Sequence, residues 1–214
     1  MASSKASIFS FLPLYNLLSA SAWAYVLYQV VTLYPKIGQP SFFIATKDLV
    51  TYVQCGAIIE VTNSLFGIVR APLVTTAAQV ASRLLVVIGI FQYVPEAENA
   101  HKIYYITLLS AWCIAEIVRY MFYFFNLVAQ APTVLVVLRY NMFYVLYPLG
   151  VGSELFIIYS ALPLAEAKYN ILYKYFLIAG MLAYIPGFPV LFSHMVAQRR
   201  KVMRSLNGDK RKSA

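Results

Sequence analysis

Six apolar stretches, each long enough to cross a lipid bilayer as a helix, constrain this chain more than any other feature. A helix needs about 20 mostly apolar residues to cross the hydrocarbon core. Stretches of that kind lie at residues 14–33, 49–69, 73–93, 103–128, 133–164 and 171–197. The last two are long enough to be tilted, broken or partly outside the hydrocarbon. Short polar or proline-containing breaks separate the stretches, among them "YPKIGQP", "PEAENAH" and "PLAEAKYN".

The composition excludes a soluble protein. Hydrophobic residues make up 61% of the 214 residues and charged residues 12%, whereas a soluble domain carries about 25% charged residues. The stretches therefore predict an all-α, polytopic membrane protein, a bundle of six transmembrane helices. We assign residues 1–198 to this bundle and residues 199–214 to a basic cytosolic tail.

The basic residues predict the orientation of the chain in the membrane. The net charge is +9, and residues 198–214 hold seven of the 17 lysines and arginines. Beside so many apolar stretches, such a cluster favours a cytosolic flank over a nucleic-acid partner. An even number of crossings then places both termini in the cytosol. Lys210 and Lys212 in "KRKSA" match the K-x-K-x-x retrieval signal of the endoplasmic reticulum, although basic tails also match this pattern by chance.

Ionisable residues inside the stretches predict a polar interior. Each charged side chain at the bilayer centre costs about 2.5–3.5 kcal/mol, so such residues face the bundle interior and have partners or a function. The chain has seven candidates: Glu60, Arg83, Glu116, Arg119, Arg139, Glu154 and Lys174. Glu116 and Arg119 are three residues apart on one helix face, where a salt bridge is expected. A direct contact with a substrate is the alternative for each of these residues.

The segment "LYPLGVGSEL" carries a tyrosine and a glutamate two helical turns apart. Tyr147 and Glu154 share one helix face, with Cα atoms about 10.5 Å apart. Pro148 removes a backbone donor, and Gly150 and Gly152 permit a bend. A phenol and a carboxyl group could thus face one substrate-sized gap. A kinked helix with a packed tyrosine and a hydrogen-bonded glutamate explains the same residues equally well.

Cysteine and histidine residues predict no metal or redox chemistry. Cys55 and Cys113 lie inside apolar stretches and are expected to be small packed residues. His101 and His194 lack partners at the spacing of metal ligands. The Cys-x₅-Arg pattern of phosphatase loops begins at Cys113, in "CIAEIVR". That segment has no glycine to wrap a phosphate, and Glu116 within it would repel one, so we reject a phosphatase.

Several long blocks, in the same order, closely resemble one family of membrane enzymes. Besides "LYPLGVGSEL", these are "CGAIIEVTNSLFGIVRAP", "TTAAQVASRLLVV", "EIVRY" and "AYIPGFPVLFSHMVAQRRK". They resemble the very-long-chain (3R)-3-hydroxyacyl-CoA dehydratases, also called protein tyrosine phosphatase-like proteins, in a fungal form. The resemblance implies an enzyme of the endoplasmic reticulum that removes water from 3-hydroxyacyl-CoA to give trans-2-enoyl-CoA. No cofactor is implied.

The resemblance also implies a catalytic pair. The family's tyrosine and glutamate correspond to Tyr147 and Glu154, and the surrounding motif is intact, including Pro148, Gly150 and Ser153. We expect Glu154 to take the C2 proton and Tyr147 to protonate the leaving hydroxyl, with the reverse allocation open. If the fifth stretch begins at residue 133, Tyr147 lies about 21 Å deep in a core of about 30 Å.

The implied substrate, an acyl-CoA, is polyanionic, and arginine binds phosphate with a two-pronged fork. Arg139, Arg70 and Arg83 are candidates for this contact, and Gly150 and Ser153 could also line the substrate site. Pairing of Arg83 and Arg139 with interior carboxylates is an equally good interpretation. Expected partners are the lipid bilayer and the other elongation enzymes, a condensing enzyme and reductases. A transporter or a structural membrane protein, with the same charges as a substrate path or packing network, is the alternative.

Overall fold

The computed structural model describes residues 6–69 and 73–212, and within them the chain forms helices joined by short connections, without a strand. In chain order the elements are α1 (Phe11–Thr32), α2 (Tyr34–Ile37), α3 (Ser41–Cys55), α4 (Ile58–Leu65), α5 (Leu73–Val87), the 3-10 helix η1 (Glu98–His101), α6 (Ile103–Val128), α7 (Thr133–Asn141), α8 (Phe143–Lys168) and α9 (Ile171–Lys212). The predicted all-α architecture is therefore confirmed.

The lengths of the helices confirm a polytopic membrane protein. Five described segments are long and apolar enough to cross a bilayer: Phe11–Ile37, Ser41–Leu65, Ile103–Val128, Phe143–Lys168 and Ile171–Leu206. The remaining predicted span, residues 73–93, is helical as α5 only over 15 residues, about 22 Å. That length is less than the roughly 30 Å of a hydrocarbon core. A count of six crossings therefore stays a prediction.

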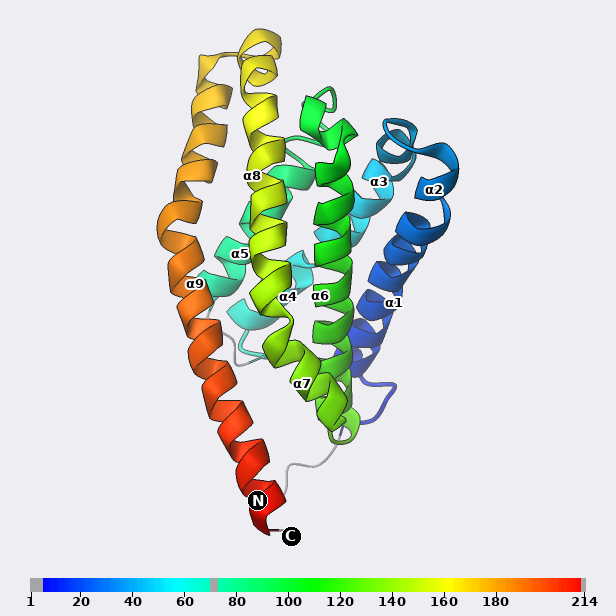
Figure 1. Ribbon diagram of the computed structural model, residues 1–214, viewed down its shortest axis with the longest axis vertical. Coiled ribbons are helices and arrows are strands. Elements are labelled where there is room, and N and C mark those ends of the chain that lie inside the picture. Colours follow the sequence, from blue (N-terminus) through cyan, green and yellow to red (C-terminus); the bar gives the residue numbers. More distant parts are fainter. Residues whose placement is uncertain (1–5, 70–72, 213–214) are drawn as a thin grey trace.

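The direction of the chain favours an even number of crossings. In Figure 1, α1 starts at the lower end of the bundle and α9 finishes there, while η1 and the α8–α9 connection lie at the upper end. α6 descends, α8 rises and α9 descends. α5 runs back toward the upper end, in the direction that a sixth crossing requires. With 15 residues it is shorter than a complete crossing.

The second predicted span begins earlier than expected. α3 starts at Ser41 and not at residue 49, and it ends at Cys55, before α4. The charged residues Lys47 and Asp48 therefore lie inside this helix and not before the span. In the structure they pair with each other (Nζ–Oδ1 2.9 Å), and the Gln92 amide donates to Asp48 Oδ1 at 2.9 Å. Once partnered, these polar groups do not interrupt the helix.

The fifth predicted span is broken, which changes the position of Tyr147. Thr133–Asn141 forms α7, and a new helix, α8, begins at Phe143 and includes Pro148. The candidate span begins at the start of α8. Tyr147 therefore lies four residues, or about 6 Å, along it and not 21 Å, and Glu154 lies about 16 Å along it. The expected depth of 21 Å assumed a span that begins at residue 133, so the depth of Tyr147 in the membrane stays a prediction.

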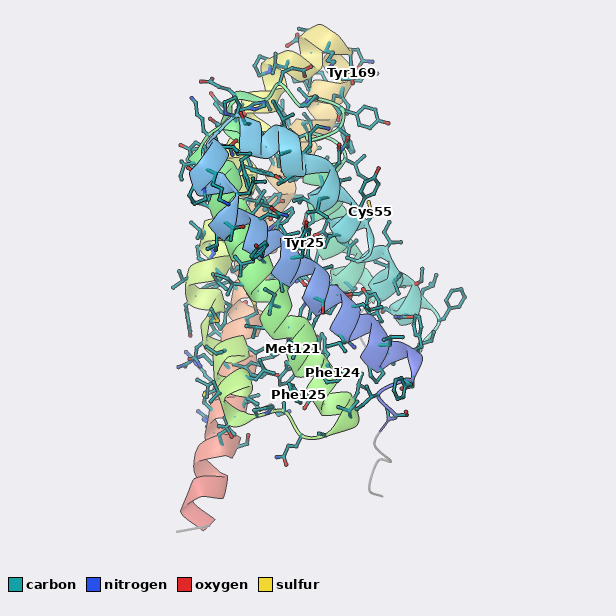
Figure 2. All side chains as sticks on the ribbon, turned by 90° about the vertical axis from the view of Figure 1, so that its right-hand side faces the viewer. Tyr25, Cys55, Met121, Phe124, Phe125 and Tyr169 are labelled. Atoms are coloured by element: carbon teal, nitrogen blue, oxygen red, sulfur yellow. The ribbon has the colours of Figure 1, made fainter. Side chains whose placement is uncertain are left out.

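α6 occupies the middle of the bundle. α1 packs against one side of α6 and α8 against another, while α9 packs against α8 (Figure 1). Figure 2 shows α1 lying across α6, on which Met121, Phe124 and Phe125 are labelled. Trp23 of α1 meets Trp112 of α6 edge to face, with ring centroids 6.3 Å apart. This central position lets α6 contribute side chains to both neighbouring interfaces.

A buried aromatic cluster fixes the end of the bundle at which α6 begins. The Phe43 ring lies 5.3 Å from Phe91, 5.0 Å from Tyr105 and 4.6 Å from His101 between centroids. The Tyr105 hydroxyl shares a 2.9 Å hydrogen bond with Thr46. Each aromatic pair contributes about 0.5–1.5 kcal/mol beyond the burial of its area. The cluster thereby holds α3, α6 and the segment after α5 together.

Candidate active site

Glu154 is a buried carboxylate held from two neighbouring helices. It lies on α8 and is 5% exposed. The indole N–H of Trp112 on α6 donates to its Oε1 at 2.8 Å, and the hydroxyl of Tyr184 on α9 donates to its Oε2. The carboxyl group therefore sits at the junction of α6, α8 and α9, with one neutral donor on each oxygen.

Tyr147 lies two turns earlier on the same helix and packs against α9. Its ring is parallel to that of Phe188, with a centroid distance of 4.9 Å and an interplanar angle of 4°, and it also stacks with Phe192. The structure thus brings the two residues of the predicted pair to one interface, between α8 and α9.

The spacing of residues on α9 matches the spacing of the pair on α8. Tyr184, Phe188 and Phe192 recur every four residues, so they share one face of α9. Because α8 and α9 are antiparallel (Figure 1), Tyr184 reaches Glu154 while Phe188 and Phe192 reach Tyr147. A single face of α9 therefore contacts both residues.

Arg83 connects this site to a neighbouring network of ion pairs. Its guanidinium, on α5, donates to Glu116 Oε1 and lies 5.2 Å from the centroid of the Trp112 ring. The predicted pairing of Arg83 with an interior carboxylate is confirmed. The guanidinium also lies over the ring of Trp112, whose indole N–H donates to Glu154.

The network continues through Arg119 to α4. Arg119 Nε donates to Glu116 Oε2 at 2.8 Å, as the three-residue spacing predicted. Its two terminal nitrogens donate to both oxygens of Glu60 at 2.7 Å each, and the Tyr120 hydroxyl donates to Glu60 Oε1 at 2.5 Å. Glu60 and Glu116 are thus committed to ion pairs that join α4, α5 and α6.

The other arginine candidates lie elsewhere. Arg139 on α7 donates to the Tyr123 hydroxyl at 2.9 Å, and its guanidinium lies 4.6 Å from the ring centroids of Phe122 and of Tyr123. Within the described part of the chain it has no carboxylate partner, so the predicted carboxylate pairing was wrong for this residue. Aromatic faces attract the cation instead. Arg70 lies outside the described residues.

Gly150, Ser153 and Lys174 have contacts that favour structural roles. A Cβ atom at Gly150 would lie 3.8 Å from Ala111 Cβ, in the α6–α8 interface. The Ser153 hydroxyl shares a 2.7 Å hydrogen bond with Thr107 and donates to the Leu149 carbonyl at 2.8 Å. Lys174 pairs with Glu166 near the α8–α9 connection and not in the bundle interior.

Three residues of this site were not predicted from the sequence: Trp112, Tyr184 and Phe188. Tyr184 and Phe188 lie in the block "AYIPGFPV", where their four-residue spacing was the available signal. Trp112 directly precedes Cys113, the start of the rejected phosphatase pattern. Cys113 is a buried free thiol, and Arg119 of the same pattern is paired with two glutamates, which agrees with that rejection.

One hollow lies at the other end of α8. Its volume is about 860 Å³, and its lining includes Asn99, Ser160, Pro163 and Lys174. Neither Tyr147 nor Glu154 lines it. A shared hollow between the pair therefore stays a prediction.

The fold and the site define a class of protein: a polytopic helical membrane protein with a phenol and a carboxylate, bound by two neutral donors, on one helix interface. Residues 54–205 match the family model described as protein tyrosine phosphatase-like protein, PTPLA. This match covers more than half of the chain, so the chain belongs to that family.

Named relatives match nearly the whole chain. It is 39% identical over 198 residues to a probable very-long-chain (3R)-3-hydroxyacyl-CoA dehydratase of Schizosaccharomyces pombe, covering 91% of this chain and 93% of the relative. It is 34% identical to human very-long-chain (3R)-3-hydroxyacyl-CoA dehydratase 2, covering 91% and 81%. It is 35% identical to the rice dehydratase PASTICCINO 2A, covering 90% and 92%. No solved structure matches the chain significantly.

Proposed function

We propose that this protein is a very-long-chain (3R)-3-hydroxyacyl-CoA dehydratase, which converts 3-hydroxyacyl-CoA to trans-2-enoyl-CoA and water. The observation that carries the proposal is the environment of Glu154, which is buried, bound by neutral donors and on the same interface as Tyr147. The names of relatives that match at least 90% of the chain supply the substrate class.

The proposed reaction is an elimination that needs one base and one acid. Glu154 removes the proton from C2, beside the thioester, and the C2–H electron pair forms the C2–C3 double bond. The C3–O bond breaks as the Tyr147 phenol donates its proton to the departing hydroxyl, which leaves as water. The proton then on Glu154 must return to the Tyr147 oxygen before the next turnover. Each positioned acid or base is worth about 10²–10⁴-fold in rate.

Glu154 is better suited to be the base than the other buried glutamates. Glu60 and Glu116 are bound to arginine, so protonating either one breaks an ion pair. Glu154 accepts one hydrogen bond on each oxygen and keeps a further lone pair on each. It can therefore change its protonation state without leaving a buried cation unpaired.

The position of the pair favours entry of the substrate from the end at which α8 begins. Tyr147 is about 6 Å and Glu154 about 16 Å along α8 from Phe143. The acyl chain would lie among the helices, while the CoA head stays outside beside α7. Arg139, on α7, is our candidate for a phosphate contact, because its Nε atom has no hydrogen-bond partner among the described residues.

We place this end of the bundle on the cytosolic side of the endoplasmic reticulum membrane. Support comes from the basic residues 198–214 and from the common end at which α1 begins and α9 finishes. An enzyme of fatty-acid elongation at this site would work beside a condensing enzyme and reductases, which are its proposed partners.

The test is turnover of (3R)-3-hydroxyacyl-CoAs of graded chain length by purified protein in lipid nanodiscs. Tyr147→Phe and Glu154→Gln should each lower kcat by at least about 10²-fold. Tyr159→Phe and Glu166→Gln are matched controls, because both residues are exposed on the same helix, α8, and these variants should retain wild-type rates. A folded protein that binds acyl-CoA without converting it would support the non-enzymatic alternative instead.

A second measurement tests the allocation of roles. With C2-deuterated substrate, Glu154→Asp should slow proton abstraction and increase the primary isotope effect. An unchanged isotope effect with a near-normal rate would count against Glu154 as the base and favour the reverse allocation.

A further inference from the structure

The carboxyl group of Glu154 differs from the other buried carboxylates in the kind of group that binds it. Glu116 and Glu60 accept hydrogen bonds from arginine. Glu154 is bound by an indole N–H and a phenol O–H, and within the described residues it takes part in no ion pair. Two neutral donors, from two different helices, therefore determine where its oxygens lie.

The two donors are themselves rigidly held. Trp112 is 2% exposed and packs edge to face against Trp23 on α1. Tyr184 lies on α9 one turn before Phe188, the residue that stacks on Tyr147. An aromatic side chain has only two rotatable bonds, so each donor fixes an oxygen of Glu154 at little cost in conformational entropy.

We propose that Trp112 and Tyr184 are positioning residues for Glu154, an inference that rests on the proposed dehydration. Together they hold the carboxylate so that a remaining lone pair points at the C2 proton of the substrate. Orientation of this kind accounts for much of enzymatic rate acceleration, and a misplacement of about 1 Å can cost about 100-fold. Because Tyr184 and Phe188 are adjacent on one face of α9, the same helix sets the position of the base relative to that of the acid.

The first experiment removes one hydroxyl group. Tyr184→Phe keeps the ring and deletes the donor to Glu154. We expect kcat to fall by at least about 10-fold, while KM changes by less than about threefold, since the substrate is bound but the base is misplaced. Tyr173→Phe is the matched control: it lies on the same helix, and it also loses one buried phenol hydrogen bond, to the Gly89 carbonyl at 2.5 Å. It should retain the wild-type kcat.

The second experiment separates positioning from general stability. Glu154→Asp withdraws the carboxylate by one methylene, out of reach of both donors. In that background, Tyr184→Phe should lower kcat further by less than about twofold, because the contact is already lost. Equal fold losses in the wild-type and Glu154→Asp backgrounds would overturn the inference, since a structural role does not depend on the length of residue 154.

Trp112→Phe removes the other donor to Glu154. Its kcat and KM are measured in both backgrounds, so the inference can still be tested if Tyr184→Phe yields no folded protein. A wild-type kcat in a folded variant lacking either donor overturns the positioning role of that donor. These results are distinguishable from failure of the proposed function. Without dehydratase activity in the wild-type protein both proposals fall, whereas an active wild type with equally active variants overturns only the positioning role.

Discussion

Replacing Glu116 with glutamine should destabilise this protein more than the same change at any other buried carboxylate of the ion-pair network. Glu116 is 3% exposed and accepts hydrogen bonds from Arg83 on one oxygen and from Arg119 on the other. Glu116→Gln keeps the shape but removes the charge. Arg119 retains Glu60 as a partner, whereas Arg83 loses the carboxylate to which it donates.

The magnitude follows from the partner left behind. Removing one member of a buried ion pair costs about 3–5 kcal/mol, because the other charge stays uncompensated. The Arg83 side chain is 25% exposed, so we expect a loss near the lower limit, about 3 kcal/mol. In Glu60→Gln, Arg119 keeps its bonds to Glu116, and we expect a loss toward the lower end of the about 1.5–3 kcal/mol typical of a hydrogen bond to a charged group.

The assay is reversible unfolding in mixed detergent micelles, followed by far-ultraviolet circular dichroism. The double variant Glu116→Gln with Arg83→Met removes both charges and should recover part of the stability lost in Glu116→Gln. The reasoning is refuted if Glu60→Gln is at least as destabilising as Glu116→Gln, or if the double variant is less stable than Glu116→Gln alone.

Three further predictions concern other parts of the molecule. Arg139→Ala should raise KM for long-chain 3-hydroxyacyl-CoA with little change in kcat, and an unchanged KM in steady-state kinetics would remove Arg139 from the binding site. The Lys168 ammonium donates to Glu96 at 2.9 Å and so lowers the pKa of Glu96. The stability that this ion pair contributes is present above the ordinary carboxyl pKa and is lost as the pH falls through the lowered pKa. Wild type and Lys168→Met should therefore differ in unfolding midpoint at neutral pH and converge at acid pH. In native micelles a maleimide should label Cys55, which is partly exposed, and leave the buried Cys113 unlabelled until the protein is unfolded, as mass spectrometry can check.

The helical architecture could be predicted from the sequence because a membrane leaves few alternatives. In lipid, every backbone N–H and C=O group must be satisfied inside the chain, so long apolar runs become helices. The limits of those helices were less certain. Lys47 and Asp48 lie within α3, where they pair with each other, and α8 begins after Met142, where no proline or glycine marks a break.

Part of the candidate site was also within reach of the sequence. Tyr147 and Glu154 are seven residues apart, and that spacing alone places them on one helix face. Arg83 was expected to have an interior carboxylate partner, which proved to be Glu116. Arg139 was expected to have one too, but it lies against aromatic rings, a contact that depends on how α7 meets α6.

The sequence by itself determined that this chain is a bundle of membrane helices with a phenol and a carboxyl group two turns apart on one of them. Both properties depend on local periodicity and on the cost of exposing polar groups to lipid. Only the tertiary structure decided which groups bind Glu154. Trp112 and Tyr184 lie 42 and 30 residues away from it in sequence, and the chain has 18 tyrosines. Which of them donates depends on the packing of α6 and α9 against α8, and no local pattern encodes that packing.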